Sequence, residues 1–255
     1  MSEEKKKTIE MFDKLKNDSN DKKMYIKKIV DTAIYFLNNR RLETNEIDIQ
    51  KLDDYSNYIK DIIEEMYDDY VERSKRENNI FEDIVFVDYG FTTITFKVGD
   101  NVIKLGKSDH DFSPIKFDTI YKVPTYIREG YNVGDNIYFR VEVSPYVDTT
   151  NITYEDSYEA YKNIRKLGYI WNDPKEENIG RIINASGCKI KGERYLPKYQ
   201  YNKGDLVIID LEDIAYVGSV TSDIIMDEIT YSSYNSNVYI FENRYIEENQ
   251  SNKKI

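Results

Sequence analysis

Residues 171–178 read WNDPKEEN, and residues 207–210 read VIID. The first segment has a lysine two residues and an asparagine five residues after Asp173, and the second ends a run of β-branched residues with Asp210. Phosphoryl transfer needs a carboxylate near the attacking hydroxyl and hard oxygen ligands for the magnesium on the triphosphate. The pattern therefore predicts the ATP and metal end of a phosphotransferase, if the upstream chain supplies the matching elements in order.

The composition indicates a folded, acidic protein. The chain has 255 residues, 40% hydrophobic and 33% charged, with a net charge of −11, so it is long enough for a sizeable core and unsuited to a DNA backbone. ATP meets the same repulsion, which magnesium and a lysine would offset locally. The single Cys188 excludes an intrachain disulfide, has no second thiol nearby for a metal site and carries no local signal of a nucleophile. With no apolar run near ~18 residues, we expect a soluble cytoplasmic protein without a membrane partner.

Residues 8–76 contain neither glycine nor proline, and their apolar residues recur at helical spacing. This predicts an all-helical N-terminal segment, in which Asn45, three residues before Asp48, would cap the second long helix. The charges of this helix are expected on its outer, solvated face. The two apolar stripes comprise Met24, Ile26, Ile29, Val30, Ala33, Ile34 and Leu37, and Leu52, Tyr55, Ile59, Ile62, Ile63, Met66 and Tyr70.

At residue 84 the hydrophobic period changes from that of a helix to that of a strand. Alternation predicts strands over 84–89 and 92–98, and the turn at 99–101 leads to a third strand over 102–105. Lys104 then lies on this third strand between apolar neighbours.

Two more strands are expected, at 125–129 and 136–143. The segment 144–148 breaks the strand pattern, and we interpret it as a hinge. The turn residues between the two strands are Gly130, Asn132 and Gly134.

A helix is predicted from Thr153, with Asp156 three residues on, to about Lys166. Short strands are expected at 179–183 and 206–209, and a further helix near 222–229. The helix from Thr153 would turn inward Tyr158, Tyr161, Ile164 and Leu167. The polar insert between the two strands contains Lys189, Lys191, Arg194, Lys198 and Lys203.

This order of strands, hinge, helix and acidic loop resembles the protein-kinase-like superfamily over about residues 82–215. The pattern is closest to small atypical bacterial kinases and aminoglycoside-phosphotransferase-like proteins. The resemblance implies an α+β, bilobal protein-kinase-like fold with a minimal C-terminal lobe. Residues 1–80 would be an all-helical N-terminal extension, 81–143 an N-lobe antiparallel β-sheet, and 144–255 the hinge and reduced helical C-lobe with the catalytic loop.

The resemblance also implies roles for single residues in binding ATP. Lys104 matches the third-strand lysine that pairs with the α- and β-phosphates. Gly90 and Thr92 match the loop that covers the phosphates, although only one glycine stands there. An exposed strand lysine and an ordinary hairpin glycine are the alternative interpretations of Lys104 and Gly90.

Four further positions match residues of the chemical step. Asp173 would orient the acceptor hydroxyl and accept its proton, and Lys175 would neutralise charge on the γ-phosphate. Asn178 and Asp210 match the two ligands of Mg2+. The alternative is an acidic loop on a surface rich in Asp and Glu.

The chain departs from the family pattern in three places. Trp171-Asn172 replaces the His-Arg before the catalytic aspartate, and Leu211-Glu212 replaces the Phe-Gly after the second aspartate. No helix follows the third strand to supply a glutamate to Lys104. Glu65 or Asp69, on the N-terminal helices, is the expected substitute.

The remaining candidates are weighed against simpler interpretations. We expect Trp171 in the core more than as a substrate platform, and His110 on the surface. The insert from Lys189 to Lys203 is expected to be a solvated hairpin loop, with binding of an anionic substrate as the alternative.

Three functions stay open on these residues. The leading hypothesis is an ATP- and Mg2+-dependent phosphotransferase that acts on a hydroxyl of a protein or small molecule. The alternative is a nucleotide-binding pseudokinase, a regulatory interaction module whose N-terminal helices bind a protein partner. The third is a helical scaffold with an unrelated mixed domain.

Overall fold

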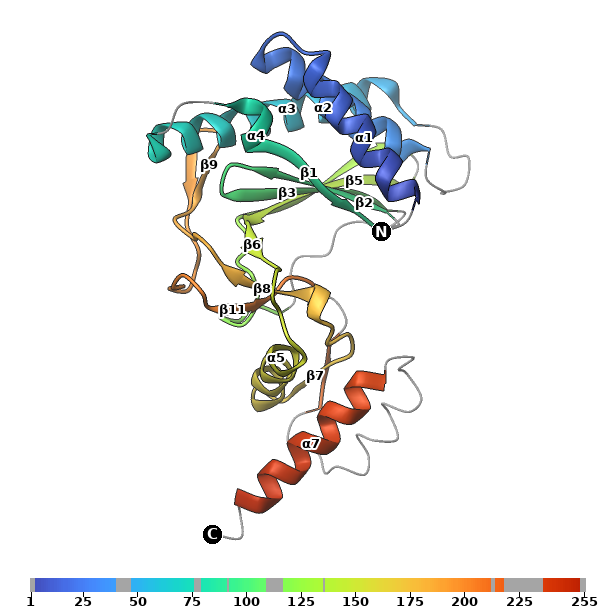
Figure 1. Ribbon diagram of the computed structural model, residues 1–255. Coiled ribbons are helices and arrows are strands. Elements are labelled where there is room, and N and C mark those ends of the chain that lie inside the picture. Colours follow the sequence, from blue (N-terminus) through green and yellow to red (C-terminus); the bar gives the residue numbers. More distant parts are fainter. Residues whose placement is uncertain are drawn as a thin grey trace. The chain divides into compact units, whose positions relative to one another are not determined.

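The computed structural model describes residues 3–39, 47–75, 79–90, 92–108, 117–134, 136–211, 214–217 and 236–252. The chain is α+β with antiparallel sheets (Figure 1), and its contacts divide it into two compact units. Unit 1 comprises residues 1–116, 124–146 and 185–198, and unit 2 comprises 117–123, 147–184 and 199–255. The segment interpreted as a hinge contains one passage between the units, after Tyr146.

Four helices open unit 1, namely α1 (Glu3–Asn17), α2 (Lys22–Asn38), α3 (Ile49–Ser74) and the short α4 (Ile80–Asp83). Asp21 and Asp48 cap α2 and α3 through side-chain oxygens that accept from backbone amides of the first turn. Asp48 is thus the cap of the second long helix, whereas Asn45 lies outside the described residues.

The sheet of unit 1 has the order β1-β2-β3-β5-β4. Its strands are β1 (Ile84–Tyr89), β2 (Thr93–Val98), β3 (Asn101–Ser108), β4 (Ile127–Gly134) and β5 (Ile137–Pro145). The predicted turn between β2 and β3 is confirmed, because Val98 pairs with Asn101. The predicted turn role of Gly130 and Asn132 is wrong, since both lie within β4 and pair with β5.

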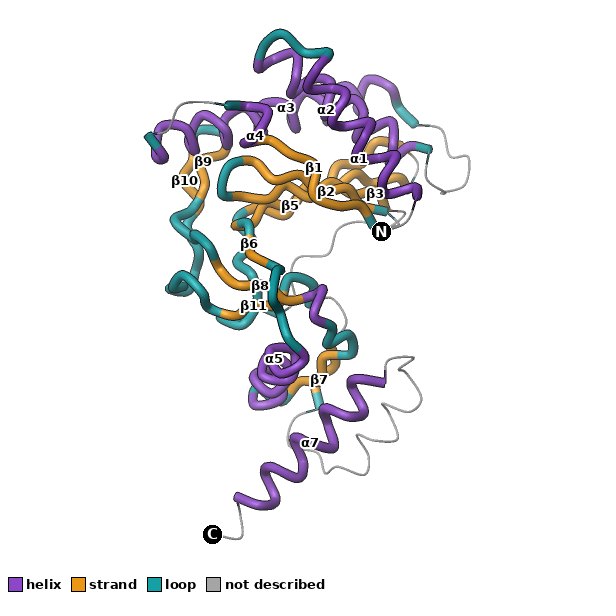
Figure 2. Tube along the Cα trace, in the orientation of Figure 1, coloured by secondary structure: helices purple, strands orange, loops and turns teal. Residues whose placement is uncertain are grey.

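Helices α2 and α3 lie on one face of this sheet (Figure 2). Most of both predicted helical stripes is buried there, against alternate residues of the strands such as Phe96, Ile103, Leu105, Val141 and Val143. Helices and sheet therefore share one core. The hairpin of β9 (Cys188–Ile190) and β10 (Glu193–Tyr195) also belongs to unit 1, although the sequence places it between strands of unit 2.

The described residues of unit 2 form two small antiparallel sheets, ordered β11-β8-β6 and β12-β7. Its elements are β6 (Val147–Asp148), α5 (Tyr154–Lys166), β7 (Tyr169–Trp171), the 3-10 turn η1 (Glu176–Asn178), β8 (Ile179–Ile182), β11 (Leu206–Ile208), β12 (Ile214–Tyr216) and α7 (Ser236–Asn252).

The predicted start of α5 is confirmed, because Thr153 and Asp156 form a reciprocal capping box. The prediction that Leu167 lies on the inner face of this helix is wrong. Leu167 follows the last turn and is 43% exposed. The helix expected near 222–229 lies outside the described residues. In the part of the chain that is described, no helix combines the length and apolar character needed to cross a bilayer.

Candidate functional site

The loop between β7 and β8 brings Asp173, Lys175 and Asn178 together. Lys175 Nζ lies 2.8 Å from Asp173 Oδ1, and the Asn178 side-chain amide donates to Asp173 Oδ2 at 2.8 Å. The backbone fixes this spacing, because the amide of Lys175 donates to the carbonyl of Asp173 at 2.9 Å and the amide of Asn178 donates to that of Lys175 at 3.0 Å. The Asp173 and Lys175 side chains are 36% and 43% exposed, so both can reach a ligand.

Asp210 is tied to the same loop through the strand that precedes it. Strand β11 pairs with β8 so that Ile208 opposes Ile179, and the amide of Ile209 donates to the carbonyl of Asn178 at 2.8 Å. Asp210 is the next residue along the chain, and its charge acts on Lys175. The pKa of Lys175 is raised, chiefly by its hydrogen bond to Asp173, and further by the charges of Asp173, Glu177 and Asp210 against a smaller opposing effect of burial.

The oxygen donors of this loop fit magnesium better than a softer metal. Nδ2 of Asn178 donates to Asp173, so the side-chain oxygen Oδ1 of Asn178 is the atom that could bind a cation. Asp210 adds a carboxylate. No group of three or more His, Cys, Asp and Glu suited to a metal occurs in the described ranges. Magnesium commonly uses one or two carboxylates, water and substrate phosphates. The donor set therefore matches a metal that arrives with a nucleotide.

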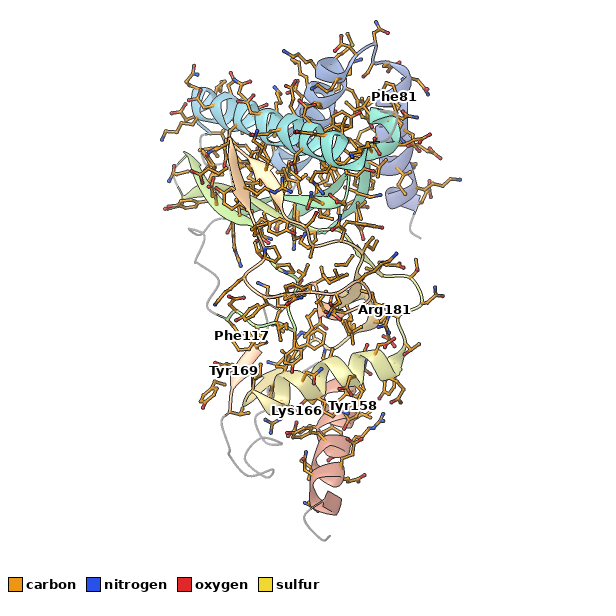
Figure 3. The ribbon with its side chains drawn as sticks, turned by 90° about the vertical axis from the view of Figure 1, so that its left-hand side faces the viewer. Phe81, Phe117, Tyr158, Lys166, Tyr169 and Arg181 are labelled. Atoms are coloured by element: carbon orange, nitrogen blue, oxygen red, sulfur yellow. The ribbon has the colours of Figure 1, made fainter. Side chains whose placement is uncertain are left out.

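A packed core lies behind the loop. Trp171 is fully buried in the cluster that includes Tyr158 and Tyr161 of α5, which confirms its predicted core role. Figure 3 labels Tyr158 on α5. It also labels Phe117 and Tyr169 of β7, whose ring centroids are 4.3 Å apart. These contacts fix the strand that carries the loop.

Lys104 lies on the face of the unit 1 sheet opposite the helices. Its neighbours Ile103 and Leu105 are fully buried against the helical layer, and Lys104 is half-buried on the other side. Thr95 on β2 and Glu142 on β5 are its direct cross-strand neighbours. Lys104 forms no ion pair or hydrogen bond through its side chain with any residue that the structure describes.

The predicted phosphate loop lies close to Lys104 along the strands. The amide of Gly90 donates to the carbonyl of Thr93, and the amide of Lys107 donates to that of Thr92, each at 2.9 Å. Thr93 opposes Gly106 on β3. Gly106 is two residues from Lys104, so their α-carbons are ~7 Å apart along the strand. Phe91 lies outside the described residues. Gly90 and Thr92 thus lie next to the start of β2, and Lys104 lies in the middle of β3, opposite Thr95.

The expected partners of Lys104 on α3 are wrong, because they lie on the helical side of the sheet and are engaged elsewhere. Asp69, 5% exposed, accepts from Arg73 Nε at 3.0 Å and also binds Arg194. Glu65 accepts from the amide of Gly192 at 2.8 Å. Neither carboxylate serves Lys104.

The basic insert is not a solvated loop over its whole length. Its β9–β10 hairpin packs on α3, where Arg194 binds Asp69, and Lys189 lies 3.7 Å from Glu65. Cys188 is fully buried, and burial raises the pKa of its thiol to about 12, so it is no nucleophile. His110 lies outside the described residues.

Sequence reasoning missed Glu142 and Arg128 on the polar face around Lys104. They are directly paired across β5 and β4 and form an ion pair with Nε and Oε1 3.3 Å apart. Alternation along both strands would have placed them on the exposed face, but only the register shows that they share a row with Lys104.

The comparisons with known proteins add little. No family model and no curated protein matches the chain. Among solved structures, it is similar to the crystal structure of the Rad53 kinase domain and SCD2, with 14% identity over 65% of this chain and a TM-score of 0.28. The match spans 62% of that chain. A TM-score of this size does not establish a shared fold, so the function has to be argued from the residues of this chain.

Proposed function

We propose that the protein is an ATP- and Mg2+-dependent phosphotransferase with a protein-kinase-like, bilobal fold and a minimal C-terminal lobe. One observation carries the proposal. The hydrogen bond from Ile209 to Asn178 joins the strand end that bears Asp210 to the loop in which Asn178 and Lys175 hold Asp173. The proposed general base Asp173, the Lys175 cation and the proposed metal ligands Asn178 and Asp210 thus belong to one connected part of unit 2.

The proposed step is attack of an acceptor hydroxyl oxygen on the γ-phosphorus of ATP. The new oxygen–phosphorus bond forms as the bond to the β–γ bridging oxygen breaks, and ADP leaves with that electron pair. The hydroxyl proton passes to the carboxylate of Asp173, which the Asn178 amide orients. Lys175 offsets negative charge on the transferred group.

Asn178 and Asp210 would hold Mg2+, which when bound neutralises phosphate charge and aligns the triphosphate. In unit 1, Lys104 is the proposed cation for the α- and β-phosphates, with Gly90 and Thr92 in the adjoining turn. The acceptor is a hydroxyl of a protein or a small molecule.

Turnover of γ-labelled ATP with magnesium tests the proposal. We expect Asp173→Ala to lower turnover roughly 10²- to 10⁴-fold, the usual contribution of a general base. Asp210→Ala should lower turnover and raise the magnesium concentration that turnover requires, because one metal ligand is lost. Glu159→Ala is the matched control, because it removes a half-exposed carboxylate of α5 that pairs only with nearby Lys162 among the described residues. Equal turnover in the wild type and both site variants would contradict an enzymatic role.

A second candidate, a nucleotide-binding pseudokinase that acts as an interaction module, is favoured by one observation. Lys104 has no carboxylate partner in the described chain, since the two acids expected from α3 bind Arg73, Arg194 and the hairpin backbone. ATP binding that Lys104→Met weakens, without any phosphate transfer, would support this function. Transfer that Asp173→Ala removes would exclude it.

A further inference from the structure

A row of polar residues crosses the face of the unit 1 sheet opposite the helices. In strand order the row contains Asp88, Thr95, Lys104, Glu142 and Arg128, each directly opposite the next. Side chains of directly opposed residues in antiparallel strands have Cβ atoms ~4.5–5.5 Å apart. Glu142 is therefore within reach of the cation on either side of it.

Glu142 is bound on only one of these sides. Its Oε1 lies 3.3 Å from Nε of Arg128 and 4.0 Å from Nη1 of Arg140, and all three side chains are largely buried, at 18%, 20% and 13% exposed. Lys104, on the other side, forms no ion pair within the described ranges. The carboxylate is thus turned toward the arginines.

Gly106 makes room for the second arginine. It is the direct cross-strand neighbour of Arg140, and a Cβ built at Gly106 would lie 2.3 Å from Arg140 Nε. The Arg140 side chain consequently lies across β3, two residues from Lys104. From this position, Nη1 of Arg140 reaches to 4.0 Å from Oε1 of Glu142.

We infer that Arg128, assisted by Arg140, is a positioning residue that holds Glu142 away from Lys104 and so keeps the Lys104 ammonium available for an anionic ligand. Without Arg128, the adjacent carboxylate would pair with Lys104 and compete with phosphate for it. Where the ligand is ATP, the inference rests on the proposed function. The arrangement of the three side chains does not depend on that function.

The chemical reactivity of Lys104 tests the inference without a nucleotide. Only a neutral amine is acylated, and pairing with a carboxylate lowers the neutral fraction. In trace acylation read by peptide mass spectrometry, we expect Arg128→Met to slow labelling of Lys104 roughly two- to five-fold, the effect of one partly exposed ion pair. In a Glu142→Gln background the same substitution should leave the rate unchanged.

The double-mutant comparison separates capture by Glu142 from a simple loss of positive charge. A loss of charge alone would act equally in both backgrounds, and that result would overturn the inference. Lys97→Met is the matched control, because it removes a cation from the same face that packs over the Tyr146 ring instead of binding Glu142. Lys97→Met should leave the rate of Lys104 labelling unchanged. Arg128→Gln, which keeps a hydrogen-bond donor, replaces Arg128→Met if the latter does not fold, with the same expected direction.

Binding of ATP with magnesium extends the test to the proposed function. We expect Arg128→Met to weaken binding roughly two- to five-fold, and the double variant with Glu142→Gln to regain wild-type affinity. If the wild type binds no ATP, or if Lys104→Met leaves the affinity for ATP unchanged, the proposed function fails. The double-mutant comparison of Lys104 acylation still decides the role of Arg128 in that case. If Lys104→Met weakens binding and Arg128→Met does not, the inference fails and the function stands.

Discussion

Gly99 closes the β2–β3 hairpin with a φ of +61°, and its α-carbon faces the ring of Tyr70 on α3. A Cβ at this position would lie 2.3 Å from Tyr70 Cγ, too close for the ring to remain in place. We predict that Gly99→Ala lowers the free energy of unfolding by more than the ~1–2 kcal/mol of a left-handed backbone alone. Urea denaturation followed by circular dichroism measures the loss.

Gly192 is the matched control for this substitution. It lies in the same unit, has a φ of +78° and has no atom within 4 Å of a built Cβ. Gly192→Ala should therefore show only the backbone cost. An equal loss in both variants would mean that Tyr70 does not pack on Gly99 as described.

The β9–β10 hairpin is held on α3 by charged side chains, with Asp69 at their centre. Asp69 is 5% exposed, whereas Arg194 is 38% exposed. Asp69→Asn removes the carboxylate of Arg194, whereas Arg73 keeps its ion pair with Asp100 at 3.0 Å, and we expect a loss of about 2 kcal/mol in stability. Arg194→Met should cost about 1 kcal/mol, because Arg73 still satisfies the carboxylate.

Urea denaturation and limited proteolysis within residues 185–198 follow this anchoring. Lys189→Met is the control, since its 3.7 Å contact with Glu65 is half-exposed and should contribute little. The hairpin of Asp69→Asn should be cleaved faster than that of Lys189→Met. Similar cleavage in both would show that Asp69 does not anchor the element.

The capping box at the start of α5 makes a pH-dependent contribution to the free energy of unfolding. Burial raises the pKa of Asp156, but the hydrogen bonds from the amide and hydroxyl of Thr153 and the charge of Arg181 outweigh it and lower the pKa overall. A lowered folded pKa stabilises the fold above the unfolded value of about 3.9, and this contribution is lost as the pH falls through the folded pKa. We expect Asp156→Asn to cost about 0.5–2 kcal/mol at pH 7 and progressively less below pH 4, measured by urea denaturation across that range. A constant difference would exclude the charge as its cause.

Elements whose causes are local could be predicted from the sequence. The capping box of α5, the β2–β3 turn and the spacing of Asp173, Lys175 and Asn178 all depend on neighbours within a few residues. The pairing of Asp69 with Arg194 could not be predicted, because Arg194 lies 125 residues away and reaches α3 through the β9–β10 hairpin. Likewise, alternation places Lys104 on a face, but only strand register shows that Glu142 is beside it.

At the scale of the whole molecule, the described residues form two cores, and each core contains one natural probe. Its single cysteine, Cys188, is fully buried in the core of unit 1, and its single tryptophan, Trp171, is fully buried in the core of unit 2. Thiol labelling reports opening of the first core, since burial raises the Cys188 pKa to about 12 and keeps the thiol unreactive in the folded state. Tryptophan fluorescence reports the second.

Because each unit has a core of its own, we predict that a cavity in one core changes chiefly its own probe. Ile63→Ala in unit 1 and Ile164→Ala in unit 2 each remove a fully buried side chain, at a cost of about 2–5 kcal/mol. Ile63→Ala should accelerate Cys188 labelling at least tenfold and leave the urea midpoint of Trp171 fluorescence unchanged. Ile164→Ala should lower the urea midpoint of Trp171 fluorescence and leave the rate of Cys188 labelling unchanged. If both substitutions shift both probes equally, the two cores unfold as one cooperative unit, and the stability of the Asp173 loop then depends on the packing of α2 and α3 as much as on α5.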